Sequence, residues 1–194
     1  MQDDTVTADL APTTFPILET EHLVLRDIRL SDAADIYAFA GDPVVQQWDG
    51  GPVTDIASVA EWIEKDCAAA ADWKAFVWGI TLKPSDTVIG RVSLGSWAKH
   101  NNHAEVGYDL AQAYWRQGIG SEAVWAVVRF AFDVLHLHRV QAFPTLDNVA
   151  SVRLLEKLGF VHEGTNREIL LMDDGLYHSV GQYSMLEHEY RPGF

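Results

Sequence analysis

Three strand-like runs between residues 75 and 110 restrict the fold more than any other feature of this sequence. The runs are AFVWGITL (75–82), TVIGRVSLGSW (87–97) and HAEVGYDL (103–110), separated by the turn-forming segments KPSD and AKHNN. This spacing predicts an antiparallel meander. The two-residue period of a strand divides the third run into two faces, Ala104, Val106, Tyr108 and Leu110 against His103, Glu105, Gly107 and Asp109. Glu105 is therefore predicted to project from the middle of a strand.

Further elements are predicted on both sides of the meander. Before it lie a strand at 22–30, a helix at 31–41 capped by Ser31, and a helix that Thr54 caps and that ends near residue 73. After it the periodicity predicts helices at 118–135 and 148–159 and strands at 138–145, 160–171 and 177–190. Residues 1–17 contain two prolines and no apolar periodicity, which predicts a flexible tail. The expected fold class is α/β (α+β), with about seven strands in a mixed, mostly antiparallel sheet and about four helices in one domain, residues 18–194.

The charge of the chain limits its partners. The formal net charge is −14 at pH 7, which should repel the phosphates of nucleic acid. Between Ser31 and Trp73 there are nine acidic residues and one basic residue, so this surface either concentrates a cationic substrate or is an ordinary solvated face. No apolar run of eighteen residues and no signal-peptide pattern occurs. A cytoplasmic protein with no membrane partner is expected.

Thiol or imidazole chemistry has little support in the sequence. Cys67 is the only cysteine and lies in an alanine-rich run without an activating neighbour. His136 and His138 have the spacing of a metal pair, but no cysteine or carboxylate cluster accompanies them. We expect no metal.

A pair of glycines, Gly118 and Gly120, stands directly before the apolar helix predicted at 118–135. Glycine lets backbone N–H groups approach a ligand, and a helix start supplies unpaired donors, so an anion such as phosphate is the natural guest. With Ala123 the pair also satisfies GxGxxA, a dinucleotide fingerprint. Seven residues separate the glycine from the preceding strand, however, and no GxxxxGK[ST] loop occurs. A dinucleotide site is the weaker of the two interpretations.

Two ordered motifs carry a resemblance to a known family. The first is WxxGxGxEA, formed by Trp115, Gly118, Gly120, Glu122 and Ala123. The second is NxxSxxxLEKLGF, from Asn148 to Phe160, followed by Glu163 and Gly164. Together with the segment LETEHLVLRDIRLSDA, they resemble the GNAT acyltransferases, and in particular the branch of ribosomal-protein N-terminal acetyltransferases. The resemblance extends over about residues 18–190 and implies the GNAT acyl-CoA N-acyltransferase fold.

The resemblance implies acetyl-CoA as the acyl donor and co-substrate. In that family the glycine loop holds the pyrophosphate, which here would be bound by Arg116, Gln117, Gly118, Ile119, Gly120 and Ser121. The preceding strand splays from its neighbour, so Asp109, Leu110 and Ala111 would contact the pantetheine arm through their main chains, and Asn148 would hydrogen-bond it. These assignments agree with the anion site expected from the glycine pair.

Acyl transfer to an amine needs a base for the amine and a proton for the departing thiolate. Glu105 matches the strand position where family members carry a carboxylate base; the alternative is a half-buried acid paired with His103 or another base. Many members have a tyrosine donor where this chain has Leu155. Ser151 then inherits the donor role, unless it is only a structural serine in the first turn of a helix.

The expected activity is an acetyl-CoA-dependent N-acetyltransferase that modifies a primary amine by direct attack on the thioester. The acceptor is a protein N-terminus, as the branch suggests, or a small cationic amine such as a polyamine or an aminoglycoside. Succinyl-CoA as donor and a non-catalytic acyl-CoA sensor remain as alternatives. Homodimers are common in this family, but the sequence leaves the oligomeric state open. Family members often have an acid where this chain has His178, so acceptor specificity does not carry over.

Overall fold

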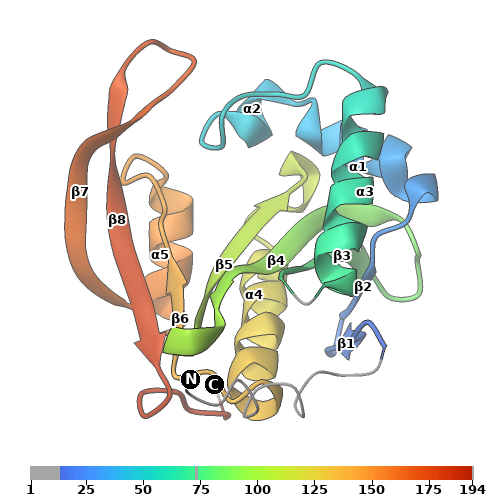
Figure 1. Cartoon of the computed structure of the whole chain (residues 1–194). Coiled ribbons are helices and arrows are strands. Elements are labelled where there is room, and N and C mark those ends of the chain that lie inside the picture. Colours follow the sequence, from blue (N-terminus) through green and yellow to red (C-terminus); the bar gives the residue numbers. More distant parts are fainter. Residues whose placement is uncertain (1–13, 73, 194) are drawn as a thin grey trace.

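The computed structural model describes residues 14–72 and 74–193, so most of the predicted tail lies outside the described residues. Eight strands form one sheet in the order β1-β2-β3-β4-β5-β6-β8-β7 (Figure 1). Their bounds are Leu18–Glu19 (β1), Leu23–Asp27 (β2), Phe76–Leu82 (β3), Val88–Ala98 (β4), His103–Leu110 (β5), Arg139–Ala142 (β6), Val161–Leu171 (β7) and Tyr177–Leu186 (β8). Strands β5 and β6 pair in parallel and the other neighbours pair antiparallel. The mixed, mostly antiparallel sheet and its β3-β4-β5 meander are confirmed.

Five α-helices flank the sheet in the described part of the chain. They are Ala33–Ala40 (α1), Pro43–Gln46 (α2), Ile56–Ala71 (α3), Ile119–Arg129 (α4) and Val149–Lys157 (α5), and a π-helical turn, Phe130–Val134, continues α4. Strand β1 and helix α2 are the two elements beyond the expected seven strands and four helices. Helix α2 forms in a segment rich in glycine and proline because Pro43 occupies its first turn and the Asp42 side chain accepts the Val44 amide.

The two helix caps predicted near the N-terminus are wrong. Asp55, and not Thr54, caps α3, because its carboxylate accepts the Ser58 amide at 2.8 Å. Ser31 lies inside a short 3₁₀ turn, and the neighbouring Asp32 is buried in a bidentate pair with Arg26 at 2.8 and 2.9 Å. A buried guanidinium needs a carboxylate partner, so the ion pair determines how the chain enters α1.

The apolar core lies on both faces of the sheet. Helices α4 and α5 cover one face, where α4 packs its valine and alanine stripe on β3, β4 and β5. Helices α1 and α3 cover the other face over a smaller cluster that includes Ile36 and Ile63. Because helices cover both faces, alternate residues of β5 face different helices, as the strand period predicts.

No helix in residues 14–72 and 74–193 is both long and apolar enough to cross a membrane.

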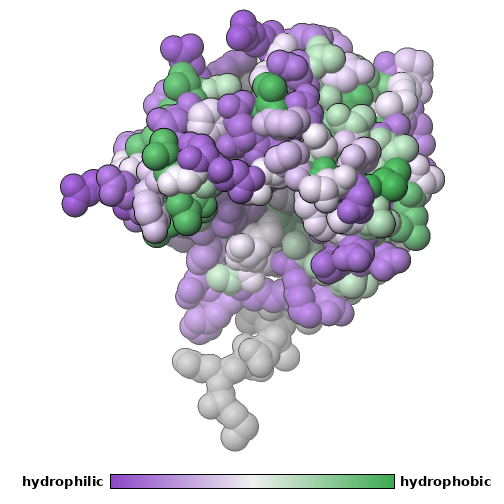
Figure 2. Space-filling view, turned by 90° about the horizontal axis from the view of Figure 1, so that it is seen from above, coloured by the Kyte–Doolittle hydropathy of each residue, from purple (hydrophilic) through white to green (hydrophobic). Residues whose placement is uncertain are grey.

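The sheet opens between β5 and β6. The two strands pair only from His103 to Glu105 on β5, against Arg139 to Gln141 on β6, whereas β5 stays paired with β4 as far as Leu110. Beyond β6 the chain turns away and Thr145 bridges to Val180 on β8 instead. Seen from above, the molecule is hollowed between its β7–β8 side and its α1–α3 side (Figure 2).

Candidate active site

The second half of β5 has backbone groups without a strand partner on its β6 side. From Val106 to Leu110 the strand is paired with β4 alone. Unpaired N–H and C=O groups along a strand are a template for another extended chain. This edge can therefore bind an extended ligand by main-chain hydrogen bonds.

The glycine loop lies where that edge meets the start of α4. Gly118 is the N-cap of α4 with φ +84°, a left-handed conformation in which a side chain would be strained. A Cβ built there would meet no atom within 4 Å. The first intrahelical bond of α4 runs from Glu122 N to Gly118 O, so the amides of Ile119, Gly120 and Ser121 belong to the unpaired first turn. The loop thus offers an open anion site at the positive end of the helix dipole.

The other residues of the predicted loop differ in how they are held. Arg116 is exposed with φ +60°, and Gln117 is exposed with its side-chain amide bonded to Ala113 O at 2.8 Å. Ile119 is buried and fixes the first turn of α4 in the core. A Cβ on Gly120 would lie 3.3 Å from Leu154 Cδ1, so glycine there permits close packing of α4 against α5. Arg116 is the member of the group with a free positive charge at the surface.

Some of the main-chain groups predicted to contact a pantetheine arm already have partners. The Ala111 amide bonds to Ile89 O at 2.9 Å, and Leu110 O accepts the Trp115 indole N–H at 2.6 Å. The Asp109 carboxylate is held by Arg91 on β4, with 2.6 Å between Asp109 Oδ2 and Arg91 Nη2. The Ala111 carbonyl also accepts the Tyr114 amide at 3.0 Å. The carbonyl oxygens of Leu110 and Ala111 can therefore each receive a hydrogen bond from a ligand through their second lone pair.

Helix α5 begins beside the same edge. Asn148 is its N-cap, and Asn148 Oδ1 accepts the Ser151 amide at 3.1 Å, which leaves the Asn148 NH₂ group for other acceptors. The Ser151 hydroxyl lies 2.7 Å from the Tyr108 hydroxyl on β5. Burial raises the pKa of Tyr108 to about 12, so the phenol is neutral at physiological pH. Tyr108 was not among the predicted site residues.

Glu105 lies on the face of β5 opposite to Tyr108, which is the face of the sheet that α1 and α3 cover. It lies where the β4–β5 ladder is interrupted between Gly95 and Ala98, and Ser96 is its hydrogen-bond partner. Burial raises the pKa of Glu105 above the ordinary 4.5, although the Ser96 bond opposes this. Among the described residues Glu105 has no ion pair with His103 or another base. An unpaired carboxylate with a raised pKa is suited to accept a proton.

Comparison with known proteins places this architecture in a family. Residues 22–161 match the model of an acetyltransferase (GNAT) domain. The chain is 33% identical over 174 residues to an uncharacterized N-acetyltransferase, YoaA, of Bacillus subtilis, covering 89% of this chain and 98% of YoaA. The chain belongs to the GNAT acetyltransferase family.

More distant relatives agree with this assignment. The chain is 28% identical to the ribosomal protein uS5-alanine N-acetyltransferase of Escherichia coli, covering 80% of this chain and 84% of that enzyme. A crystal structure of the microcin C7 self-immunity acetyltransferase MccE, in complex with acetyl-CoA and AMP, superposes with a TM-score of 0.79 at 21% identity, covering 86% and 93% of the two chains. The protein is an N-acetyltransferase with the GNAT fold, as the two sequence motifs implied.

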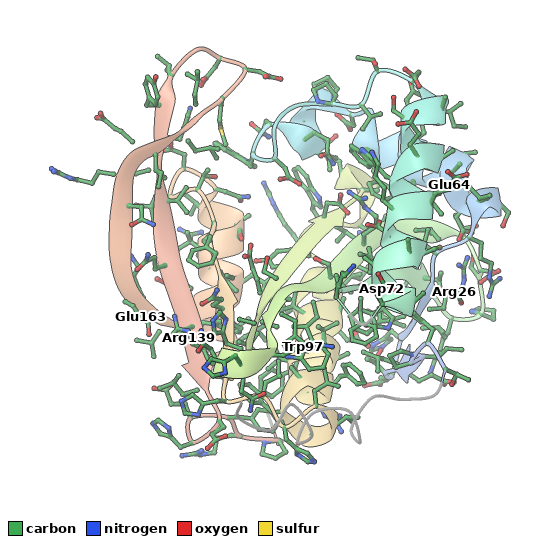
Figure 3. All side chains as sticks on the ribbon, in the orientation of Figure 1. Arg26, Glu64, Asp72, Trp97, Arg139 and Glu163 are labelled. Atoms are coloured by element: carbon green, nitrogen blue, oxygen red, sulfur yellow. The ribbon has the colours of Figure 1, made fainter. Side chains whose placement is uncertain are left out.

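Two acids of the GNAT motifs have structural partners. Glu122, in the first turn of α4, accepts the Thr20 hydroxyl at 2.5 Å and the His22 amide at 3.0 Å, which fastens the glycine loop to the β1–β2 turn. Glu163 on β7 makes a bidentate pair with Arg139 on β6, and Figure 3 shows these two side chains together where β6, β7 and β8 meet. These two acids hold the elements of the GNAT domain in place. In the sequence they can be found only through the two motifs that contain or precede them.

A charged cluster on the α3 face of β4 and β5 joins part of the predicted acidic surface, Asp49 and Asp66, to Asp109 through Arg91, which was not among the predicted site residues. Arg91 is 17% exposed, is bonded to Asp109, and lies 5.1 Å from the ring centroid of Trp62. A surface hollow beside it is lined by Asp49, Trp62, Lys65, Asp66 and Arg91. Burial raises the pKa values of Asp49 and Asp66, and Arg91 opposes the rise. The three carboxylates of Asp49, Asp66 and Asp109 outnumber the two cations, Arg91 and Lys65, so the cluster has an excess of negative charge.

His178 is held between two acids at the end of the β7–β8 hairpin. Its Nδ1 lies 2.8 Å from Asp147 Oδ2 and its Nε2 lies 2.9 Å from Asp174 Oδ2. Both ring nitrogens can donate only in the imidazolium, and the two acids raise the pKa of His178. The pair Asp147–His178 ties the hairpin to the loop before α5 of the GNAT domain. Within the described part of the chain, no three His, Cys, Asp or Glu side chains form a group that could hold a metal ion.

Proposed function

We propose that the protein transfers the acetyl group of acetyl-CoA to a primary amine by direct attack on the thioester. The observation that carries the proposal is the separation of β5 from β6 after Glu105, next to a left-handed glycine with open space before it. In the proposal the pyrophosphate is bound by the amides from Gly118 to Ser121, with Arg116 adding charge. The pantetheine arm follows the free edge of β5 near Ala111, and the Asn148 NH₂ group holds it.

Glu105 accepts the proton of the attacking amine, directly or through water. Its raised pKa and its lack of an ion pair support this role. As the C–S bond breaks, its electron pair goes to sulfur. An alcohol is a much weaker acid than a thiol, so Ser151 keeps its proton and stabilises the thiolate by donating a hydrogen bond. The proton that finally reaches the sulfur comes from the amine by way of Glu105 or solvent.

Two classes of acceptor follow from different observations. The name of the Escherichia coli relative supports the N-terminal amine of a ribosomal protein. The excess negative charge around Arg91 supports a small cationic amine, because Asp109 of that cluster and Glu105 project from the same face of β5. In either case the acceptor enters from the α3 side, and only the second class requires Asp49 and Asp66.

A thiol-release assay tests the function. The acceptors are N-terminal peptides beginning with small residues, polyamines and aminoglycosides, with acetyl-CoA and succinyl-CoA each as the donor. We expect release with acetyl-CoA and at least one amine, and Asp49→Asn together with Asp66→Asn should lower it for polyamines and not for peptides. Binding of acetyl-CoA by calorimetry without release for any acceptor would favour the sensor alternative. The absence of both binding and release would refute the proposal.

A further inference from the structure

Tyr108 is a partly buried phenol that the proposed chemistry does not yet use. It lies on β5 three residues beyond the last residue paired with β6, in the strand segment whose edge is free. Its side chain faces α4 and α5, and packs against the core that those helices cover. A phenol in that position can contact a ligand bound at the free edge, or it can contact a residue that itself touches such a ligand.

The partner of the phenol is Ser151. The two hydroxyl oxygens are 2.7 Å apart, the ordinary length of a hydrogen bond between hydroxyl groups, and Tyr108 Oη also lies 3.5 Å from the carbonyl oxygen of Ser151. The Ser151 amide is meanwhile fixed by the Asn148 cap. Both the backbone and the hydroxyl of Ser151 are thus held, one by the helix cap and the other by β5.

The direction of this hydrogen bond decides what Ser151 can do. Each hydroxyl has one proton, and one of the two protons lies between the oxygens. The positions of the two oxygens allow either one to donate. Because a phenol is the stronger acid and hence the better donor, we assign Tyr108 as the donor and Ser151 Oγ as the acceptor. The Ser151 proton is then left to donate elsewhere, and within the described residues Tyr108 is the partner that the structure gives to this hydroxyl.

We propose that Tyr108 is a positioning residue for acyl transfer: its phenol donates to Ser151 Oγ and so directs the Ser151 O–H toward the sulfur that leaves the thioester. The proposal rests on the proposed function. Tyr108 transfers no proton and touches no reacting atom. It acts by determining which way the Ser151 hydroxyl points and by withdrawing electron density from that oxygen, which makes the Ser151 proton a better donor.

The test compares Tyr108→Phe with Ser151→Ala, with the double variant and with a matched control. The control is Tyr190→Phe, which removes a different partly buried phenol that donates to Asp133 at 2.9 Å near the end of α4 and whose pKa is likewise raised to about 12. The measurements are kcat and KM for acetyl-CoA, by thiol release with the acceptor found in the panel and also by the slow hydrolysis of acetyl-CoA without acceptor. Thermal unfolding of each variant reports any loss of stability.

We expect Tyr108→Phe to lower kcat about threefold to tenfold, the effect of one hydrogen bond made in the transition state. The KM for acetyl-CoA should stay within about twofold, because the thiolate exists only after the C–S bond begins to break. In the Ser151→Ala background Tyr108→Phe should cause no further loss. Tyr190→Phe should leave kcat unchanged.

Three results would overturn the inference. The first is an unchanged kcat in Tyr108→Phe. The second is a double variant whose fold-decrease in kcat equals the product of the two single decreases. The third is a decrease in kcat that also occurs in Tyr190→Phe and follows the loss of thermal stability in both variants. If the unaltered protein neither binds nor hydrolyses acetyl-CoA, the proposed function falls and the role of Tyr108 falls with it. If the unaltered protein is active and any one of the three results appears, the proposed function stands without Tyr108.

Discussion

Replacing Gly118 with alanine separates the conformational role of this glycine from its role at the anion site. With φ +84° and no atom within 4 Å of a built Cβ, Gly118→Ala strains the backbone without a clash. A left-handed conformation costs an L-residue roughly 1–2 kcal/mol. We expect the free energy of unfolding to fall by about 1 kcal/mol, which for a chain of this size lowers the melting temperature by about 2–4 °C.

The effect on the ligand should exceed the effect on stability. The new methyl group projects into the space that the proposal assigns to the pyrophosphate, in front of the amides from Ile119 to Ser121. Losing one hydrogen bond to a charged group costs about 1.5–3 kcal/mol, which corresponds to about a tenfold to hundredfold rise in the dissociation constant for acetyl-CoA. Calorimetric titration of the folded variant at 25 °C measures it.

Gly175→Ala supplies the matched control. Gly175 lies in the β7–β8 turn, has φ +76°, and likewise has nothing within 4 Å of a built Cβ. The strain should therefore be similar in both variants, while only Gly118→Ala weakens binding. If the two variants lost the same stability and bound acetyl-CoA equally well, Gly118 would be a conformational glycine and the pyrophosphate would have to bind elsewhere.

Three further predictions concern charged groups. Glu105→Gln should lower kcat about a hundredfold or more. In the unaltered protein kcat should rise with pH through a pKa above the ordinary 4.5 of a glutamate. A pH profile of thiol release measures both, and a fall in kcat at low pH that persists in Glu105→Gln would identify a different base. Asp32→Asn leaves the Arg26 guanidinium buried without its bidentate partner and should lower the free energy of unfolding in urea by about 3 kcal/mol. Burial alone would raise the pKa of Asp32, but the hydrogen bonds from Arg26 hold it below the ordinary 3.8. The stabilising contribution of the pair is therefore complete above pH 3.8 and is lost as the pH falls through the lower pKa of the folded state. Asp147 and Asp174 raise the pKa of His178 above the ordinary 6.5. The stabilising contribution of His178 is therefore complete below pH 6.5 and is lost as the pH rises through the pKa of the folded state. Melting curves from pH 6 to 9 should show this loss, and His178→Gln should remove that pH dependence.

The sequence predicts the fold well because the elements that define it have strong local signals. The meander has alternating runs with polar turns, and α4 has a continuous apolar stripe, so each local preference agrees with the final packing. Helix α2 was missed because four residues are too few for a period, and proline and glycine also favour loops. Ser31 was misjudged as a cap because the neighbouring Asp32 pairs with Arg26 on β2, and the local cap signal does not contain that contact.

The contacts of the site depend on pairs that are distant in the sequence. Tyr108 and Ser151 are 43 residues apart, and Arg139 and Glu163 are 24 apart. Strand alternation predicts the face on which Tyr108 lies, but not which helix begins opposite it. The motif NxxS identifies Asn148 and Ser151, and the cap that joins them is a local contact. The motif contains no information on the hydrogen bond between Ser151 and Tyr108, because Tyr108 is distant in the sequence. A tyrosine three residues after a strand acid is the one local signal that could have drawn attention to Tyr108.

That spacing of three is the geometric basis of the proposed mechanism. An odd number of residues along a strand places two side chains on opposite faces. Glu105 therefore lies on one face of β5, while Tyr108 lies on the face toward α4 and α5, where its partner Ser151 is located. The strand itself runs between them, with its free edge toward the position assigned to the thioester. The amine and its base can then approach from one face of the strand while the sulfur, which leaves from another corner of the tetrahedral intermediate, is stabilised from the other face. A spacing of two or four would place the acid and the phenol on one face, where the acceptor and the departing sulfur would compete for the same space.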